Sequence, residues 1–149
     1  GRVFGLLDLG TGKSRSLTPR GVKFDLGRHT VSPDGKIDAA MHDQEIWLYP
    51  IAGGEPLPLK STLPVDRLMR SSADGRFPYG RKWKSGGAEV VWIEISTGRA
   101  EVWKTVRPSD RAGITAVYCI QVSRDEKSYF YNYTRIRSDL FLVAGLREA

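Results

Sequence analysis

Short apolar runs alternate with polar breaks along the whole chain, and the runs recur in pairs. They are rich in β-branched and aromatic residues and are bounded by Gly, Pro or Asp. Runs of this length and composition predict β-strands, and no stretch has the period of a helix. Several runs, such as Val90-Val91-Trp92-Ile93, are apolar at consecutive positions. Both faces of such a strand are expected to be buried, as in a sheet packed between two neighbouring sheets.

A serine–aspartate motif precedes each pair of runs. Val31-Ser32-Pro33-Asp34-Gly35-Lys36 is followed by two related stretches, Ser72-Ala73-Asp74-Gly75-Arg76 and Ser123-Arg124-Asp125-Glu126-Lys127. A unit of about 40 to 50 residues, with Asp-Gly at a tight turn between strands, is typical of propeller blades. The sequence therefore predicts an all-β fold, a partial β-propeller of about three four-stranded antiparallel blades that is incomplete at both ends.

The predicted blades occupy residues 1–149 as one propeller fragment. The segments are the outer strands of a blade at 1–19, complete blades at 28–60 and 67–106, and a blade lacking its last strand at 115–146. The predicted inner hairpins, each turning at its Asp motif, are Val31 to Met41, Ser71 to Tyr79 and Val122 to Tyr133.

Three local features refine these predictions. The run Asp139-Leu140-Phe141-Leu142-Val143 follows the last inner hairpin and is expected to form a third strand. Pro78 lacks a ladder donor, so its strand is expected to be bulged or to lie at an exposed edge. Glu126 stands where the other motifs have glycine. Because glycine is the residue that adopts positive φ freely, a turn of another type is expected there.

The turn sequences resemble those of TolB-like, WD-type β-propeller repeats of bacteria over nearly the whole chain. Some are similar to the last blades of propellers at the C-terminal ends of bacterial Ser/Thr protein kinases. These stretches are 9–13 (LGTGK), 49–56 (YPIAGGEP), 96–99 (STGR), 108–113 (PSDRAG) and 138–143 (SDLFLV). The resemblance implies a sensory or interaction module attached to a signalling enzyme and no catalytic residue in this chain. It also favours the extracytoplasmic side of a membrane-anchored protein.

The composition is that of a folded chain. A hydrophobic fraction of 40% with 27% charged residues argues against disorder. No run of about 18 apolar residues is present, so no membrane-spanning helix is expected in this chain. Cys119 is the single cysteine and excludes an intramolecular disulfide. Its apolar neighbours predict a buried thiol.

Motifs that carry chemistry are missing from the sequence. The glycine-rich loop, the His-Arg-Asp motif and the Asp-Phe-Gly motif of a kinase are absent, and Gly10-Thr11-Gly12-Lys13 lacks the spacing of a phosphate-binding loop. His42 beside Asp43 is better explained by a surface turn than by a metal site. We predict no catalytic residue, no metal and no cofactor. The open alternative is the propeller portion of a hydrolase or peptidase whose catalytic residues lie outside this chain.

The net charge of +6 favours acidic partners. In a propeller, the loops between second and third strands share one face with the loops between blades. That face receives Arg20, Lys23, Lys60, Arg67, Lys82, Lys84, Arg107, Arg111, Arg135 and Arg137. The candidate binding residues are Lys82, Trp83, Lys84, Arg107, Arg111, Arg135 and Arg137.

Trp83 is expected to act as an aromatic anchor between two lysines. The expected partners are a protein or acidic ligand, including nucleic acid, and the missing blades or a second copy at the exposed blade edges. The competing interpretation is a charged surface that only keeps the chain soluble. The alternating Tyr129, Tyr131 and Tyr133 are expected to pack between blades rather than stack on bases.

Overall fold

The computed structural model describes residues 4–18 and 24–142. These residues form twelve strands and no helix, so the all-β prediction is confirmed. The strands are β1 (Gly5–Leu7), β2 (Ser14–Ser16), β3 (Phe24–Val31), β4 (Ile37–His42), β5 (Glu45–Pro50), β6 (Leu57–Leu59), β7 (Arg67–Ser71), β8 (Pro78–Lys84), β9 (Gly87–Ile93), β10 (Ala100–Val106), β11 (Ile114–Val122) and β12 (Tyr129–Arg135).

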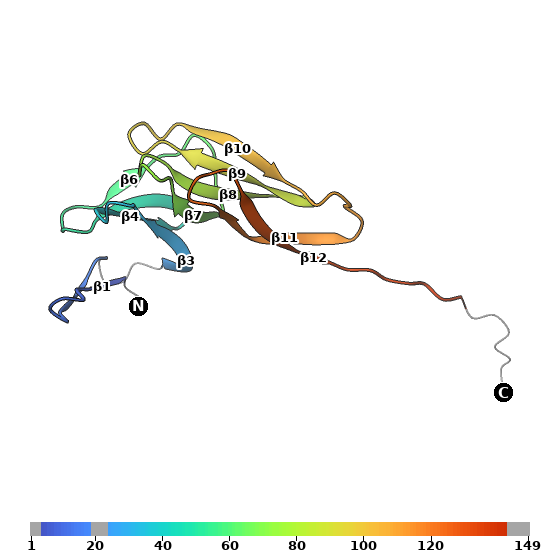
Figure 1. The fold of residues 1–149 in the computed structure, drawn as a ribbon, viewed down its shortest axis with the longest axis horizontal. Coiled ribbons are helices and arrows are strands. Elements are labelled where there is room, and N and C mark those ends of the chain that lie inside the picture. The colour runs from blue at the N-terminus through green and yellow to red at the C-terminus, as the bar shows by residue number, and fades with distance from the viewer. Residues whose placement is uncertain (1–3, 19–23, 143–149) are drawn as a thin grey trace.

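The strands form four antiparallel sheets that are stacked beside one another (Figure 1). Two of them are complete blades, with the strand orders β3-β4-β5-β6 and β7-β8-β9-β10. The pairs β1-β2 and β11-β12 are two-stranded. Stacked antiparallel sheets of this kind confirm the predicted partial propeller. Within the described residues the β11-β12 pair has two strands, where three are predicted for its blade.

The core lies between the sheets and not within one of them. One cluster joins the two complete blades through residues such as Met41, Leu48 and Ile93. A second joins the β7–β10 blade to the β11-β12 pair and includes Tyr79, Val117 and the half-buried Tyr131. Neighbouring residues of β9 point into different clusters, and both are fully buried, Val91 into the first and Val90 into the second. The prediction of strands buried on both faces is therefore confirmed. Inter-blade packing is confirmed for Tyr131 and is wrong for Tyr129 and Tyr133, which are 38% and 45% exposed.

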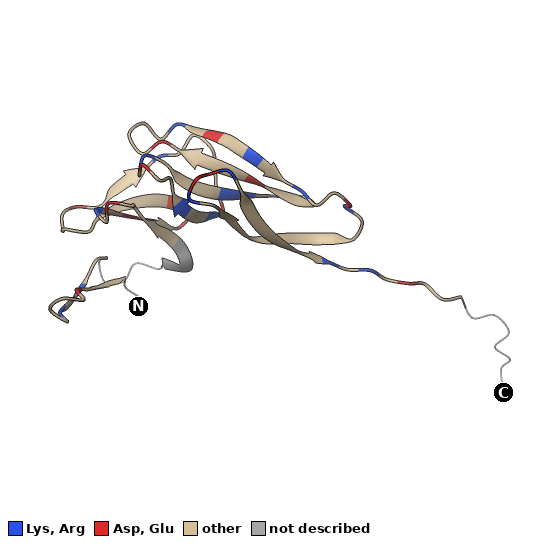
Figure 2. Cartoon of the chain, viewed as in Figure 1, with Lys and Arg blue, Asp and Glu red and all other residues tan. Residues whose placement is uncertain are grey.

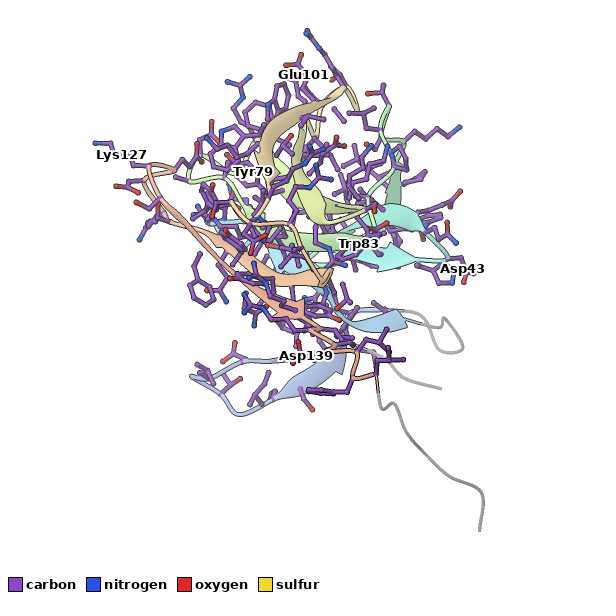
Figure 3. The ribbon with its side chains drawn as sticks, turned by 90° about the vertical axis from the view of Figure 1, so that its right-hand side faces the viewer. Asp43, Tyr79, Trp83, Glu101, Lys127 and Asp139 are labelled. Atoms are coloured by element: carbon purple, nitrogen blue, oxygen red, sulfur yellow. The ribbon has the colours of Figure 1, made fainter. Side chains whose placement is uncertain are left out.

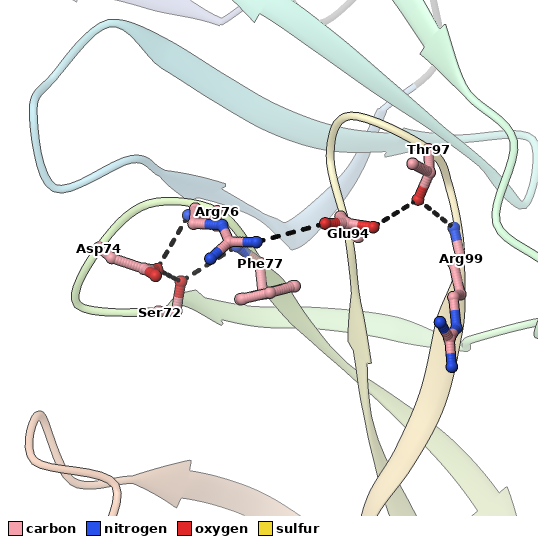
Figure 4. Close-up of polar contacts among 7 residues, drawn as sticks. All are labelled: Ser72, Asp74, Arg76, Phe77, Glu94, Thr97 and Arg99. Atoms are coloured by element: carbon pink, nitrogen blue, oxygen red, sulfur yellow. Dashed lines mark hydrogen bonds and ion pairs between the residues drawn. The ribbon is translucent and has the colours of Figure 1, made fainter.

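The inner hairpin of each blade turns at its serine–aspartate motif. In the second blade the Ser72 hydroxyl donates to Asp74 Oδ1 at 2.5 Å, and this carboxylate oxygen accepts the Arg76 N–H at 3.0 Å. The Ser72 Oγ also accepts the Phe77 N–H at 3.0 Å (Figure 4). Gly75 completes the turn at a φ of 75°. The motif around Ser32 makes the same three hydrogen bonds.

The third motif forms the same turn, so the prediction of a different turn type at Glu126 is wrong. The Ser123 hydroxyl donates to Asp125 Oδ1 at 2.6 Å. As in the other two turns, this carboxylate oxygen accepts the Lys127 N–H, and the Ser123 Oγ accepts the Ser128 N–H. Glu126 adopts a φ of 60° in place of glycine. The hydroxyl of Tyr79, on the neighbouring blade, is hydrogen-bonded to Glu126.

The β9–β10 and β1–β2 hairpins share a second kind of turn. In the β9–β10 turn, the Gly98 N–H donates to the Glu94 carbonyl at 2.8 Å, and Thr97 and Arg76 bond the Glu94 carboxylate (Figure 4). The β1–β2 turn repeats the backbone bond, from the Gly12 N–H to the Asp8 carbonyl at 2.8 Å. The β1-β2 pair thus has the turn of an outer half-blade.

Pro78, Cys119 and the run after β12 depart from the predictions. Pro78 begins β8 inside its sheet, beside a register shift in β7, so the bulge is confirmed and the exposed edge is wrong. Cys119 is exposed rather than buried, because a bulge between Tyr118 and Gln121 gives it a φ of 44°. Residues 136–142 form no strand, where a third strand was predicted, and 143–146 lie outside the described residues.

Candidate functional site

The β8–β9 turn, the β10–β11 connection and the end of β12 meet at one end of the blades. A Cβ at Gly86 would lie 3.7 Å from the Arg111 guanidinium, and one at Gly113 would lie 2.1 Å from the Ile136 carbonyl oxygen. Figure 3 places Trp83 at this end and Lys127, in an Asp turn, on the other side. Three of the loops that the loop order assigns to one face therefore lie together. The carbonyl of Lys60, which the loop order assigns to the same face, lies beside the β9–β10 turn, since a Cβ at Gly98 would be 2.1 Å from its oxygen. The basic end is the set Lys84, Arg107, Arg111, Arg135 and Arg137.

Three of these cations surround the glycine pair of the β8–β9 turn. A Cβ at Gly87 would lie 2.7 Å from the Val106 carbonyl oxygen and 2.8 Å from Arg107 Cγ, so only glycine fits under this strand end. Arg107 and Arg111 consequently lie over the turn. Lys84 ends β8 beside it, and its Nζ lies 3.4 Å from a Glu89 carboxylate oxygen.

Arg135 holds the connection between blades rather than presenting a free charge. Its Nη1 lies 2.8 Å from Asp110 Oδ2, and its Nη2 donates to the Asp110 carbonyl at 2.8 Å. The Ala112 N–H and the charges of Arg135 and Arg137 lower the pKa of Asp110. Arg137 is exposed in the segment after β12, where Figure 2 shows basic positions continuing away from the blades.

Strand geometry separates Trp83 from the two lysines beside it. Lys82 pairs with Glu89, and Trp83 pairs with Ala88. Since successive side chains of a strand point to opposite faces, Trp83 lies on the face away from Lys82 and Lys84. The anchor between two lysines is therefore not formed as predicted.

Trp83 instead lines a groove of about 440 Å³ between β7–β8 and β11. Its other lining residues are Arg67, Arg81, Ala116 and Tyr118. Arg67 and Arg81 are cross-strand partners, and Arg81 lies two residues before Trp83, so all three share one face. Arg81 was missed from the candidate set, although this alternation within one strand is a signal that the sequence contains.

A second cavity of about 400 Å³ continues from the groove along the same strands, from Arg67–Arg70 to Cys119–Val122. Arg70 fixes its far end. The Arg70 Nη1 donates to the Val122 carbonyl at 3.0 Å and the Ser123 carbonyl at 2.5 Å, across the boundary between blades. The groove and the second cavity therefore lie between the β7–β10 blade and the β11-β12 pair, and the hydrogen bonds of Arg70 join these two sheets at the far end of the cavity.

The serines of the Asp turns and His42 make structural contacts. The hydroxyls of Ser32 and Ser72 are engaged inside the Asp turns. His42 ends β4, with its Nε2 3.2 Å from Asp43, and the described residues contain no group of three or more potential metal ligands. The same part of the chain has no helix that could cross a membrane. Arg20 and Lys23 lie outside the described residues.

Comparison with known proteins shows the fold. No family model and no curated protein matches the sequence. The structure is similar to the crystal structure of TolB from Acinetobacter baumannii, with a TM-score of 0.60 at 17% sequence identity. The similarity covers 92% of this chain and 33% of the TolB chain. The chain thus has the fold of a β-propeller and spans about a third of the length of that protein.

Proposed function

We propose that the chain is part of a non-catalytic β-propeller module that binds an acidic segment of a partner protein in the groove beside Trp83, with the cations of the neighbouring basic end attracting the ligand. The observation that supports this proposal is the groove, which combines Arg67 and Arg81 with the rings of Trp83 and Tyr118. Arginine and large aromatic residues are the side chains that most often dominate the energy of protein interfaces. The cations of the basic end lie at the neighbouring loops.

The energetics require several contacts to act together. An exposed ion pair contributes about 1 kcal/mol or less, so the loop cations alone give weak binding. Guanidinium groups bind carboxylates through paired hydrogen bonds, and aromatic rings add buried apolar area. The groove contains both guanidinium groups and aromatic rings, while the cations on the loops of the basic end attract the ligand over a longer range. Affinity should therefore fall as ionic strength rises.

Titration of the chain with a glutamate-rich peptide, followed by Trp fluorescence and calorimetry, tests this function. The variant Lys84→Ser/Arg107→Ser/Arg111→Ser should raise the dissociation constant about 10-fold or more and flatten its salt dependence. Trp83→Ala should weaken binding with little change in salt dependence.

The matched control removes three cations from the opposite end, in Lys36→Ser/Arg76→Ser/Lys127→Ser. It should change affinity by less than about twofold, since exposed pairs far from the ligand are screened. Equal losses from the two triple variants would contradict a site at the basic end.

The second candidate function is a nucleic-acid-binding propeller. Binding of a single-stranded oligonucleotide with the same charge as the glutamate-rich peptide distinguishes it from the first. Tyr118 is 46% exposed and Trp83 is 37% exposed, so both rings offer faces on which bases could stack. Tighter binding of the oligonucleotide than of the peptide would favour that function.

The attachment to a signalling enzyme is a further part of the proposal. It rests on the resemblance of the turn sequences to the C-terminal propellers of bacterial Ser/Thr protein kinases. The full reading frame tests it directly. A kinase domain upstream would support it, and a hydrolase or peptidase domain would replace it with the enzyme alternative.

A further inference from the structure

The outer edge of β12 and the apolar segment that follows it are both uncovered. In each complete blade a third strand pairs with the second, β5 with β4 and β9 with β8. Within residues 4–18 and 24–142, no strand pairs with the outer side of β12. Leu140, Phe141 and Leu142 are 98%, 82% and 94% exposed. Contiguous apolar residues at this exposure mark a contact surface.

The segment has the sequence of a third strand. Asp139-Leu140-Phe141-Leu142 repeats the order of Glu45-Ile46-Trp47-Leu48 at the start of β5, an acidic residue followed by aliphatic, aromatic and aliphatic side chains. The docking arm is defined as residues 139–142. It extends away from the blades beyond β12 (Figure 1).

The residues before the arm explain why it does not fold back. The complete blades reverse direction through residues with positive φ, Asp43 and Gln44 in one and Gly86 in the other. The Ile136 N–H donates to the Gly113 carbonyl at 2.8 Å, so Ile136 still belongs to the β11-β12 ladder. Only Arg137 and Ser138 remain for a tight turn, and neither residue type favours the left-handed conformation.

We propose that the outer edge of β12 binds the docking arm of a second copy of this chain, so that two copies exchange arms reciprocally. The exchange gives each last blade its third strand without a tight turn. Main-chain hydrogen bonds of the added strand satisfy the open edge, and alternate side chains contact the partner. The apolar residues of the arm then leave water beside the exposed ring of Tyr133. Such an interface is isologous and closes as a dimer.

Sedimentation velocity of the 149-residue chain over a range of concentrations tests the assembly. The chain should sediment as a dimer, and a chain truncated after Ser138 should sediment as a monomer with an unchanged circular dichroism spectrum. Leu140→Asp/Leu142→Asp should raise the dimer dissociation constant about 100-fold or more, because two buried leucines are lost. Leu9→Asp is the control, since Leu9 is 90% exposed in an outer turn. It should leave the dimer intact.

Cross-linking separates exchange between chains from folding back within one chain. In a Cys119→Ser background, chains carrying Tyr133→Cys or Leu142→Cys are given tags of different size, mixed and treated with a short bismaleimide. A covalent species containing both tags is expected. Cross-linking only within a chain that carries both substitutions would overturn the exchange. A monomeric full chain, or a dimer that persists after truncation at Ser138, would overturn it too.

Discussion

At the scale of the residue, the serine–aspartate turn is held by its side chains as much as by glycine. The three turns make the same hydrogen bonds, although one of them has Glu126 at the position of Gly35 and Gly75. A left-handed conformation costs a non-glycine residue about 1–2 kcal/mol. Glu126 offsets this cost by its hydrogen bond with the buried Tyr79, whose pKa is raised to about 12 by burial and by the Glu126 carboxylate.

Glu126→Gly should therefore have two opposite effects on the free energy of unfolding, relief of backbone strain and loss of the hydrogen bond to Tyr79. A double-mutant cycle with Tyr79→Phe separates them. In a Tyr79→Phe background the glycine should stabilise the fold by about 1 kcal/mol, because backbone strain is relieved and no hydrogen bond is lost. In the presence of Tyr79 the gain should shrink or reverse. Urea unfolding of the four chains measures the coupling. Gly35→Ala, in open space at a φ of 69°, is the control for strain alone and should destabilise the fold. Equal effects of Glu126→Gly in both backgrounds would exclude the coupling.

The turn carboxylates also predict the behaviour of the fold in acid. The Ser32 hydroxyl and the Lys36 N–H lower the pKa of Asp34, and the equivalent groups lower those of Asp74 and Asp125. Because the folded pKa lies below the unfolded value of about 3.9, the ionised form adds stability above that pH, and this is lost as pH falls through the folded pKa. Asp34→Asn should thus be less stable than the wild type at pH 7.

The difference should begin to shrink below about pH 4 and should disappear only where the lowered pKa of folded Asp34 has been passed, because the folded carboxyl is protonated there as well. Thermal unfolding from pH 7 down to about pH 2 measures it, with Glu55→Gln as the control for removing one negative charge from a turn. A constant difference across this range would rule out the carboxylate as its cause.

At the scale of the element, the sequence predicts most of the strands because the strand signals are local. Apolar runs and the Asp turns locate the inner hairpins, and these agree with the structure. The wrong predictions, for the burial of Cys119 and the sheet position of Pro78, concern features that depend on the pairing of neighbouring strands. Cys119 is turned outward by a bulge, and Pro78 is accommodated inside the sheet because β7 shifts register opposite it. Neither adjustment is encoded in the residue itself.

Gly80 shows how closely one blade approaches the next. A Cβ at this position would lie 2.5 Å from Val65 Cγ1, on the segment that leads into β7, and Gly80 needs no positive φ. Gly80→Ala should therefore cost about 1–3 kcal/mol through overpacking, and Val65→Ala in the same chain should recover part of the loss. Chemical denaturation checks both. Gly5→Ala, where the nearest atom is 3.9 Å away, should cost little. A Gly80→Ala chain as stable as the wild type would contradict this packing.

At the scale of the whole molecule, loop order predicts which charges gather at one end but not which side chains meet. The basic end follows from the alternation of loops between the two ends of a propeller, and this needs only the order of the strands. The groove around Trp83 could not be derived in the same way. It depends on how the β11 hairpin packs against β7, which brings Tyr118 to the face of Arg67 and Arg81.

Arg70 joins the last hairpin to the complete blades, so its loss should uncouple one part of the molecule. A stack in which each unit contacts only its neighbours can open from an end without unfolding elsewhere. Arg70→Met should remove the hydrogen bonds to the Val122 and Ser123 carbonyls while keeping most of the side-chain volume. Hydrogen bonds to charged groups contribute about 1.5–3 kcal/mol, so amide protection in β11 and β12 should fall about 10- to 100-fold.

Hydrogen exchange followed by mass spectrometry measures this loss of protection. β4 and β5 should exchange as in the wild type, because the Arg70 side chain donates its hydrogen bonds to the carbonyls of Ser71, Val122 and Ser123. Arg99→Met is the matched control, since the Arg99 side chain is exposed and pairs with Glu101, two residues away in the same blade. If protection instead falls equally in every blade, the molecule unfolds as one cooperative unit, and Arg70 is not a local joint between blades.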